Sequence, residues 1–389
     1  MKVVPSNGMS HPSILLTASE GQRYSRHLVL PEVGIEGQRR LKGSSVLVVG
    51  MGGLGIPAAV YLASAGVGQI GIVDNDVVEM TNLQRQFLFN EADLGKKKVE
   101  VAAARLRQVN PNVKIVTSDR RLDSSNALDI MRDYEVVVDA TDNLPSRYLI
   151  NDACVMLGKP DVYASVLGFD GQASVFWSKQ GPCYRCLYPE PPPPEMVQSC
   201  ETAGVLGVLP GVMGGLQAIQ AIQILLGRGS PLVGRLLIFS GMDTSFDEVR
   251  IKKDSHCALC GPNPTVTKLV DYEEFCGTKK MEHVEFDVTP KALKASIDRG
   301  EKPVLLDVRE TWEYELCHLE GTTLIPLGQL QARMNELDRA KEVVVYCHTG
   351  IRSTQAVALL RQAGFSNARN LQGGIDSWAR QIDPKMQRY

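Results

Sequence analysis

Continuous apolar runs alternate with helix-like segments through the first part of the chain. The segment SSVLVVG (44–50) is uninterrupted and ends in glycine, which is typical of a parallel strand buried on both faces. Further helices and strands of the same series are predicted at 56–66, 69–76, 96–110, 113–119 and 134–143. This βαβαβ order predicts a Rossmann-like parallel sheet with right-handed crossovers.

The pattern changes after about residue 160. Two long strand-like segments, 161–177 and 235–242, predict that the sheet becomes mixed, and a second α/β unit follows with strands at 303–309, 323–327 and 342–347 and a helix at 353–365. The predicted organisation is a disordered start (1–17), a first domain (18–270), a linker (271–282) and a second α/β domain (283–389).

One segment passes a first test for a membrane span. Residues 202–227 contain no charged side chain, but they include six glycines, a proline and three glutamines. Because the apolar residues of the second half recur at helical spacing, we expect a buried core or interface helix and no membrane partner. The N-terminal 20 residues lack the pattern of a signal peptide.

Composition narrows the range of functions. The 389 residues carry a net charge of −2, so the chain has no basic field with which to bind nucleic acid. The nine cysteines are odd in number, and four of them form CxxC pairs. This pattern favours a reducing, cytoplasmic location with metal-binding or reactive thiols.

A glycine-rich turn follows the first strand. In GMGGLG, Gly50, Gly52, Gly53 and Gly55 stand between strand and helix, where glycines let the backbone approach phosphate oxygens. Asp74 ends the next strand, about 20 residues on, at the position that binds a ribose hydroxyl. By itself this motif indicates a dinucleotide, with NAD as the default ligand.

Other polar residues near the same sheet edge fit NAD less well. TNLQRQF supplies Asn82 and Arg85, Lys98 stands at a helix start, and ATDN ends in Asp142 and Asn143. Two cations and a carboxylate around a mononucleotide suit a triphosphate with Mg²⁺ better than a nicotinamide.

The combination of GMGGLG, VDND, NLQRQ, the GKKK lysine and ATDN resembles the E1-like adenylyltransferases of the ThiF/MoeB type, over residues 20–265. These enzymes activate ubiquitin-like sulfur carriers. The resemblance implies that ATP or its Mg²⁺ is contacted by Gly53, Asp74, Asn82, Arg85, Lys98 and Asp142. It also implies a homodimer, in which Arg26 of RYSRH reaches the nucleotide of the other subunit.

Two cysteine pairs have the spacing of zinc knuckles. PCYRC supplies Cys183 and Cys186, and HCALC supplies Cys257 and Cys260. Two CxxC knuckles about 70 residues apart can converge on one tetrahedral, structural Zn²⁺ site without an open position for water. The family resemblance also implies zinc at these residues.

The remaining cysteines differ in context. Cys200 follows a proline-rich segment, and a thiol on such a loop could attack an acyl-adenylate or receive sulfur. SCETAGV resembles the stretch that holds a catalytic cysteine in ubiquitin-like E1 relatives. The alternative is an incidental loop cysteine. Cys154, Cys276 and Cys317 are interpreted as core or linker residues.

A second reactive loop lies near the end of the sequence. In YCHTGIRS, Cys347 closes a strand and Ser353 opens a helix. Backbone N–H groups of the loop and the helix dipole are expected to stabilise a thiolate or persulfide, and Arg352 is expected to add positive charge. The Cys-x4-Arg spacing is one residue shorter than a phosphatase loop, which favours sulfur over a phosphoryl group.

Residues 284–381 resemble a single rhodanese domain, on this loop together with LLDVRETWEYELCHLEGTTLIPL and LQGGIDSW. Asp307, Arg309 and Glu313 are expected to hold the fold. The fused chain resembles molybdopterin-synthase sulfurylases. The resemblance implies adenylation of a carrier that ends in Gly-Gly, and then sulfur transfer from thiosulfate or a cysteine desulfurase to give a thiocarboxylate.

Two other functions remain open at this point. An NAD-dependent oxidoreductase with an appended sulfurtransferase is distinguished by NAD reduction instead of ATP–pyrophosphate exchange. A zinc-stapled scaffold that only binds a carrier is distinguished by the absence of AMP release.

Overall fold

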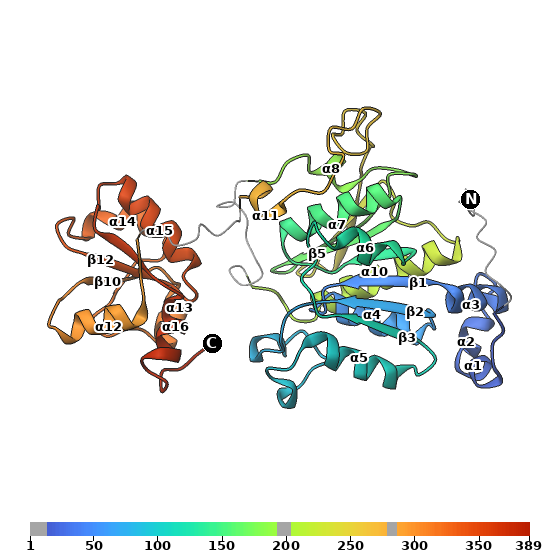
Figure 1. Ribbon diagram of the computed structural model, residues 1–389, viewed down its shortest axis with the longest axis horizontal. Helices are drawn as coiled ribbons and strands as arrows, with labels where there is room; N and C mark the ends of the chain where they lie inside the picture. The colour runs from blue at the N-terminus through green and yellow to red at the C-terminus, as the bar shows by residue number, and fades with distance from the viewer. Residues whose placement is uncertain (1–13, 193–203, 278–285) are drawn as a thin grey trace. The chain divides into compact units, whose positions relative to one another are not determined.

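The computed structural model describes residues 14–192, 204–277 and 286–389 and divides the chain into two compact units, Met1–Lys279 and Lys280–Tyr389 (Figure 1). Each unit is built on its own central sheet. The predicted fold class, a Rossmann-like domain with a mixed sheet followed by a second α/β domain, is confirmed. Of the predicted disordered start, residues 1–13 lie outside the described residues, and Thr17 already caps the first helix.

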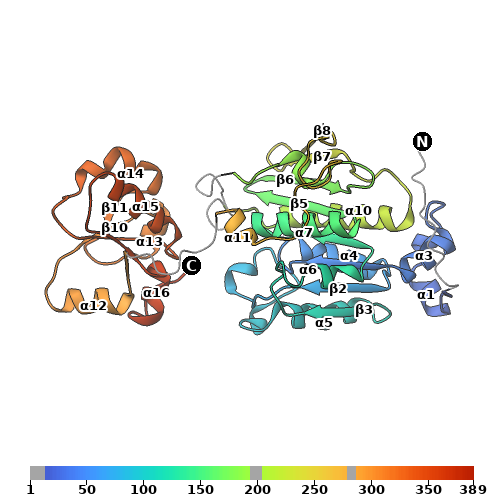
Figure 2. The ribbon, with the colours of Figure 1, turned by 45° about the horizontal axis from the view of Figure 1, so that its top comes forward.

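The N-terminal unit contains an eight-stranded sheet in the order β3-β2-β1-β4-β5-β6-β7-β8. The first five strands along the chain run parallel, and β6, β7 and β8 continue the sheet antiparallel, with β8 at the edge opposite β3 (Figure 2). The strands are β1 (Ser45–Val49), β2 (Gln69–Val73), β3 (Lys114–Ser118), β4 (Val136–Asp139), β5 (Asp161–Leu167), β6 (Asp170–Phe176), β7 (Arg235–Ser240) and β8 (Ser245–Arg250).

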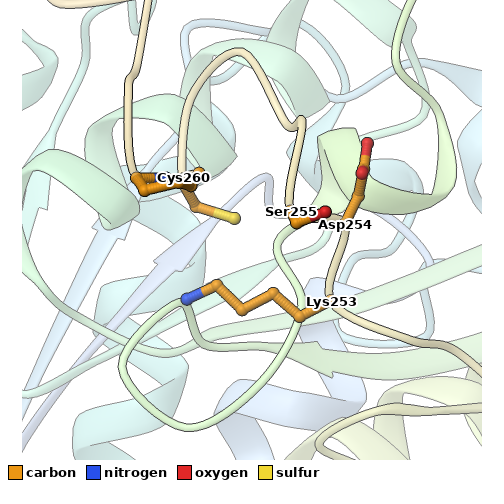
Figure 3. Close-up of a pocket in the computed structure, with 6 residues that line it drawn as sticks. Lys253, Asp254, Ser255 and Cys260 are labelled. Atoms are coloured by element: carbon orange, nitrogen blue, oxygen red, sulfur yellow. The ribbon is translucent and has the colours of Figure 1, made fainter.

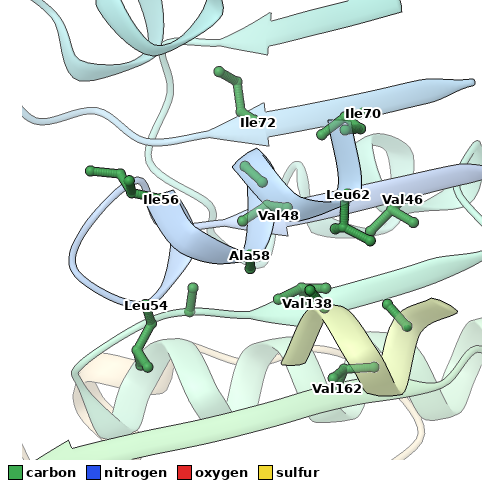
Figure 4. Packing of buried hydrophobic residues seen from close by; sticks show 14 of the residues in the cluster. Val46, Val48, Leu54, Ile56, Ala58, Leu62, Ile70, Ile72, Val138 and Val162 are labelled. Carbon is green, nitrogen blue, oxygen red and sulfur yellow. The ribbon is translucent and has the colours of Figure 1, made fainter. Parts of the chain in front are cut away.

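The sheet is buried on both faces because successive side chains of a strand point to opposite sides. In β1, Val46 and Val48 belong to one hydrophobic core, and Leu47 and Val49 belong to the other. Figure 4 shows the first core, where strand side chains meet those of the helix that follows the glycine turn. The run SSVLVVG is therefore continuously apolar because β1 is buried on both faces of the sheet, as predicted.

Helices cover both faces of this sheet. The first face holds α4 (Gly55–Ser64), α5 (Lys98–Val109) and α10 (Leu209–Leu226), and the second holds α6 (Ala127–Arg132), α7 (Leu144–Leu157), α8 (Tyr184–Leu187) and α11 (Tyr272–Phe275). Among the described helices, α10 is the one long and apolar enough to cross a membrane, and 56% of it is buried. It packs on α4, β5 and β6, as predicted for a core helix.

The predicted linker begins later in the structure than in the sequence interpretation. Tyr272 is buried, and its hydroxyl donates a 2.7 Å hydrogen bond to Asp152. Cys276 is buried in the same core. Residues 271–277 thus belong to the N-terminal unit. A four-residue helix is too short to show periodicity, which is why the sequence alone gave a linker here.

The C-terminal unit contains a five-stranded, all-parallel sheet in the order β11-β10-β12-β13-β9. One core lies against α14 and α15, and the other lies against α12 and α16. The elements are β9 (Asp287–Val288), α12 (Pro290–Asp298), β10 (Val304–Asp307), α13 (Thr311–Leu316), β11 (Thr323–Leu324), α14 (Leu327–Arg333), β12 (Val343–Tyr346), α15 (Ile351–Gln362), β13 (Ala368–Leu371) and α16 (Gly374–Gln381).

Candidate functional site

The turn between β1 and α4 needs glycine at two positions. Gly50 has a φ of +96°, and a Cβ there would lie 2.7 Å from the carbonyl oxygen of Ala140. A Cβ at Gly55 would overlap the Gly50 carbonyl oxygen. The turn is therefore closed tightly between β1 and β4, and the N-terminus of α4 begins directly behind it.

This turn lies at the switch point of the sheet. In the order β3-β2-β1-β4, β2 and β3 lie on one side of β1 and β4 lies on the other, and ligands of open α/β sheets bind where the order reverses. Gly50, Asp74 and Asp142 follow the carboxyl ends of β1, β2 and β4. The structure thus brings these three residues of the predicted nucleotide site to one edge of the sheet.

Asp74 holds the glycine turn. Its carboxylate accepts hydrogen bonds from the backbone N–H of Met51 at 2.7 Å and of Asp76 at 2.8 Å. Burial raises the pKa of Asp74, and the charge of Lys98 opposes that shift. The contact of Asp74 with a ribose hydroxyl remains a prediction. The two backbone donors hold the carboxylate in a fixed position.

Lys98 opens α5, as predicted, and it is only 5% exposed. Its ammonium group lies 2.9 Å from the carboxylate of Asp76. Asp76 was absent from the sequence-predicted site, although it stands two residues after Asp74. Burial and the ion pair with Asp76 hold the ammonium group of Lys98 in one position. A cation held in this way is suited to binding a phosphate.

The segment that follows β2 supplies three further polar groups. Asn82 is buried and accepts a hydrogen bond from Glu79 N, and the Arg85 guanidinium donates to Thr81 O at 2.9 Å. Gln86 is 3% exposed, its Oε1 has no hydrogen-bond partner among the described residues, and its Nε2 lies beside Gly52.

The amide of Gln86 therefore has an acceptor oxygen left for a hydrogen bond to a ligand or to water, and its nitrogen lies beside the glycine turn. Gln86 is the last residue of NLQRQ, and the motif does not show that its side chain is buried.

Gly53 faces the side chains of Pro210 and Arg85, and a Cβ there would lie 2.9 Å from Pro210. Asp142 is exposed at the sheet edge. Asn143 caps α7 by accepting a hydrogen bond from Ser146 N at 3.0 Å, and its amide lies 3.4 Å from Asp142. Asn143 therefore has a structural role here, and its contact with a nucleotide stays a prediction.

Arg26 lies on α2 (Ser25–Leu28), between α1 (Ala18–Arg23) and α3 (Gly34–Gly43), and its side chain is exposed. An exposed cation on a peripheral helix is accessible to a second subunit. Its predicted reach into the nucleotide site of a partner stays a prediction.

The four cysteines of the two CxxC pairs converge. The Sγ atoms of Cys183, Cys186, Cys257 and Cys260 all lie within 4.8 Å of one another. The distances Cys183–Cys257 and Cys186–Cys260 are 3.6 and 3.4 Å, and tetrahedral zinc with Zn–S bonds of about 2.3 Å requires sulfur atoms about 3.8 Å apart.

The surroundings of the cluster also suit a metal. Asp254 N donates a 3.4 Å hydrogen bond to Cys186 Sγ. Lys253, Asp254 and Ser255 border a hollow beside Cys260 (Figure 3), while His256 points into solvent. The donor set and spacing fit a structural zinc ion, which would tie the loop after β8 to α8 and the cysteine that precedes it.

Removal of one of these cysteines is expected to release the metal and destabilise the N-terminal unit. The purified chain should hold one zinc ion, and Cys257→Ser should reduce it to background. Structural zinc is worth roughly 10 kcal/mol or more in isolated peptides. Loss of even about 3 kcal/mol would lower the unfolding midpoint by roughly 6–12 °C.

Metal analysis and thermal unfolding measure both effects. Cys317→Ser, in the other unit, serves as the control and should keep its zinc. A zinc-free wild-type chain, purified without chelator, would contradict the assignment.

Cys200 lies outside the described residues, so its predicted role as a catalytic thiol stays a prediction. Cys154 and Cys276 are buried in the second core of the N-terminal unit, as interpreted. Cys317 lies in the C-terminal unit, with its sulfur 3.9 Å from an Arg309 nitrogen.

Cys347 directly follows β12 and is 1% exposed. The backbone N–H of Gly350 donates to its Sγ at 3.1 Å, and the Ser353 hydroxyl lies 3.4 Å away. Helix α15 starts at Ile351, so its positive end is directed at the loop. These are the features that stabilise a sulfur anion, and they match the arrangement predicted from YCHTGIRS.

The Cys347 loop packs closely against the two glycines of the LQGGIDSW segment, Gly373 and Gly374. Gly350 has a φ of +98°, and a Cβ there would lie 3.2 Å from the backbone nitrogen of Gly373, while a Cβ at Gly374 would overlap the carbonyl oxygens of Cys347 and His348. The backbone N–H of Ile375 donates to Cys347 O at 2.9 Å. The LQGGIDSW segment therefore holds the backbone of Cys347 and His348 in place.

Arg352 differs from the expectation of a free positive charge. Its guanidinium binds both carboxylate oxygens of Glu313, at 2.6 and 2.7 Å. Burial raises the pKa of Glu313, but hydrogen bonds from Arg352, Glu310 N and Tyr389 outweigh burial and lower it to about 2. The sequence could not show this because Glu313 lies 39 residues upstream.

Comparison with known proteins follows the two units. Residues 24–259 match the model of the ThiF family, and residues 289–381 match that of the rhodanese-like domain. A probable adenylyltransferase/sulfurtransferase, MoeZ, from Mycobacterium tuberculosis is 43% identical over 97% of both chains. The adenylyltransferase and sulfurtransferase MOCS3 of Mus musculus is 42% identical over 97% of this chain and 89% of that protein.

Solved structures share the fold of the N-terminal unit. Escherichia coli MccB with ATP superposes with a TM-score of 0.56 at 23% identity, over 64% of this chain and 77% of that chain. The complex of MccB with MccA-N7isoASN gives a TM-score of 0.55 at 22% identity, over the same shares. Adenylyl transfer implies the use of ATP. The chain therefore belongs to the ThiF family in the form that carries a C-terminal rhodanese-like domain, and it is an adenylyltransferase and sulfurtransferase.

Proposed function

We propose that the enzyme adenylates the C-terminal glycine of a ubiquitin-like sulfur carrier and then converts it to a thiocarboxylate. The observation that carries the proposal is the presence of two chemically complementary sites on one chain. One is a glycine turn with polar residues at the switch point of the first sheet, where we place the nucleotide, and the other is a buried thiol that accepts a backbone hydrogen bond in the loop before α15.

The first step joins carboxylate and nucleotide. A carboxylate oxygen of the carrier attacks the α-phosphorus of ATP, the bond to the β-phosphate breaks, and pyrophosphate leaves. Lys98 and Arg85 would offset the charge that develops on the phosphates. Asp142 would hold Mg²⁺, which would offset part of the negative charge of the phosphates. Gln86 adds an amide beside the glycine turn.

The second step brings sulfur. The Cys347 thiolate attacks the sulfane sulfur of thiosulfate and displaces sulfite, which leaves a Cys347 persulfide. The terminal sulfur attacks the acyl carbon, AMP leaves, and the carrier is held as an acyl disulfide. A second thiol, either Cys200 or an external thiol, then reduces the S–S bond and frees the thiocarboxylate. Alternatively, Cys200 first takes the carrier as a thioester.

The proposal also covers the location of the enzyme, its oligomeric state, its metal and its protein partners. The enzyme acts in the cytoplasm as a homodimer, and Arg26 of each subunit reaches the nucleotide of the other. The four cysteines hold zinc. Carriers of molybdopterin synthase, of cysteine synthesis and of tRNA thiolation are the candidate partners, and a cysteine desulfurase is the candidate protein donor.

Mass spectrometry of intact carrier tests the proposal. A candidate Gly-Gly carrier is incubated with enzyme, ATP, Mg²⁺, thiosulfate and dithiothreitol, and we expect a gain of about 16 Da by replacement of one oxygen with sulfur. The matched control is the same carrier extended by one residue after Gly-Gly. ATP–pyrophosphate exchange should depend on the authentic carrier. NAD reduction in place of exchange, or binding without AMP release, would contradict the proposal.

A further inference from the structure

Tyr389 connects two ion pairs around the Cys347 loop. Arg309 Nη1 donates to the Tyr389 hydroxyl oxygen at 2.7 Å, and that hydroxyl donates to Glu313 Oε1 at 2.7 Å. The same oxygen of Glu313 accepts a hydrogen bond from Arg352 Nη2. Arg309 is itself paired with Asp307, and both are fully buried. The hydroxyl thus links the buried Asp307–Arg309 pair to the loop arginine.

The ring of Tyr389 also touches the loop. It stacks on His348, the residue after Cys347, with centroids 4.3 Å apart and planes within 16°. Trp312 packs edge-on against the Tyr389 ring, with the two ring centroids 5.6 Å apart. Burial raises the pKa of Tyr389, so the hydroxyl keeps its proton and can donate to Glu313 at neutral pH.

We propose that Tyr389 is a positioning residue for sulfur transfer: its ring fixes His348 in the Cys347 loop, and its hydroxyl weakens the hold of Glu313 on Arg352. The proposal rests on the proposed function, in which Cys347 carries the sulfur. Tyr389, a residue outside the loop, would thus control how much of the positive charge of Arg352 is available to an anionic sulfur donor.

The physical reason is competition for one oxygen. A hydrogen bond from a neutral hydroxyl draws charge from Glu313 Oε1, so Arg352 is compensated less completely than in an isolated Arg–carboxylate pair. Without the hydroxyl, Glu313 would bind Arg352 alone and more tightly. Thiosulfate carries two negative charges, and its binding should therefore weaken. The stacked ring, which orients the loop backbone, would be unaffected.

Tyr389→Phe separates these two roles. In the thiosulfate:cyanide reaction of the full chain, we expect the KM for thiosulfate to rise about threefold to tenfold while kcat stays within about twofold. With methanethiosulfonate, a donor of one negative charge, the rise should be smaller. Tyr314→Phe is the matched control, because Tyr314 stacks on His318 at 4.0 Å but is not among the described partners of Glu313 or Arg352. It should leave both constants unchanged.

Tyr389→Ala removes the ring as well, and it should lower kcat at least about tenfold. Titration of His348 by NMR reports the stacking directly. Burial lowers the pKa of His348, Asp376 on α16 and Glu313 on α13 oppose that shift, and Arg309 and Arg352 add to it. Loss of the ring exposes the imidazole, so this pKa should rise toward its ordinary value in Tyr389→Ala and stay near the wild-type value in Tyr389→Phe.

The outcomes separate this inference from the proposed function. Unchanged KM in Tyr389→Phe, or a fall in kcat alone, would overturn the role of the hydroxyl even if Cys347→Ala is inactive. An unchanged His348 titration in Tyr389→Ala would overturn the role of the ring. Residual wild-type activity in Cys347→Ala would instead refute the proposed function itself.

Discussion

Cys347→Ala is expected to keep AMP-forming activity and carrier adenylation but to make no thiocarboxylate. Thiosulfate:cyanide activity should fall by at least about 10³-fold, because removal of a nucleophile leaves no covalent route. The sulfur of Cys347 receives the Gly350 N–H and faces the start of α15. The nucleotide residues lie in a separate compact unit, so their chemistry should persist without the thiol.

Cys200→Ala is the informative comparison for this prediction. It should leave the thiosulfate reaction unchanged, because that cysteine belongs to the other unit, and it should reduce transfer of sulfur to the carrier. Intact mass of the carrier after incubation with ATP, thiosulfate and each variant measures the product. Thiocarboxylate made from thiosulfate by the Cys347→Ala enzyme would contradict the division of labour between the two units.

The elements that the sequence predicted well are those fixed by local chemistry. The apolar run before Gly50 predicted a strand buried on both faces, and Val46 and Leu47 indeed point into different cores. CxxC spacing predicted the convergence of four thiols. In each case a short pattern carries the whole physical reason, whether a buried strand, a tight turn or a chelating knuckle.

What the sequence could not show depends on contacts across long separations. The Arg352–Glu313 pair joins residues 39 positions apart, and Tyr389 meets Glu313 across 76. Whether a loop arginine is free or paired is decided by such contacts and not by the loop motif. The burial of Gln86 beside the glycine turn is of the same kind, since only folding places the turn and the NLQRQ segment together.

Arg85→Ala and Asp142→Ala should each slow carrier-dependent ATP–pyrophosphate exchange by about 10²–10³-fold, while the protein stays folded. Loss of one preorganised charge typically costs this much in rate, and both side chains stand at the switch point of the sheet without supporting its core. Arg85 donates to the carbonyl of Thr81 and lies against Gly53, whereas Asp142 is exposed at the end of β4.

A surface ion pair of the same unit supplies the matched control. Arg132 and Asp129 on α6 lie 3.2 Å apart and are largely exposed, and such pairs contribute little to stability. Arg132→Ala and Asp129→Ala remove the same charges at a distance from the glycine turn, so exchange should continue at the wild-type rate. If all four variants exchange equally fast, the switch point is not the nucleotide site. If the control pair alone is active, the loss in Arg85→Ala and Asp142→Ala reflects the position of the charges and not their number.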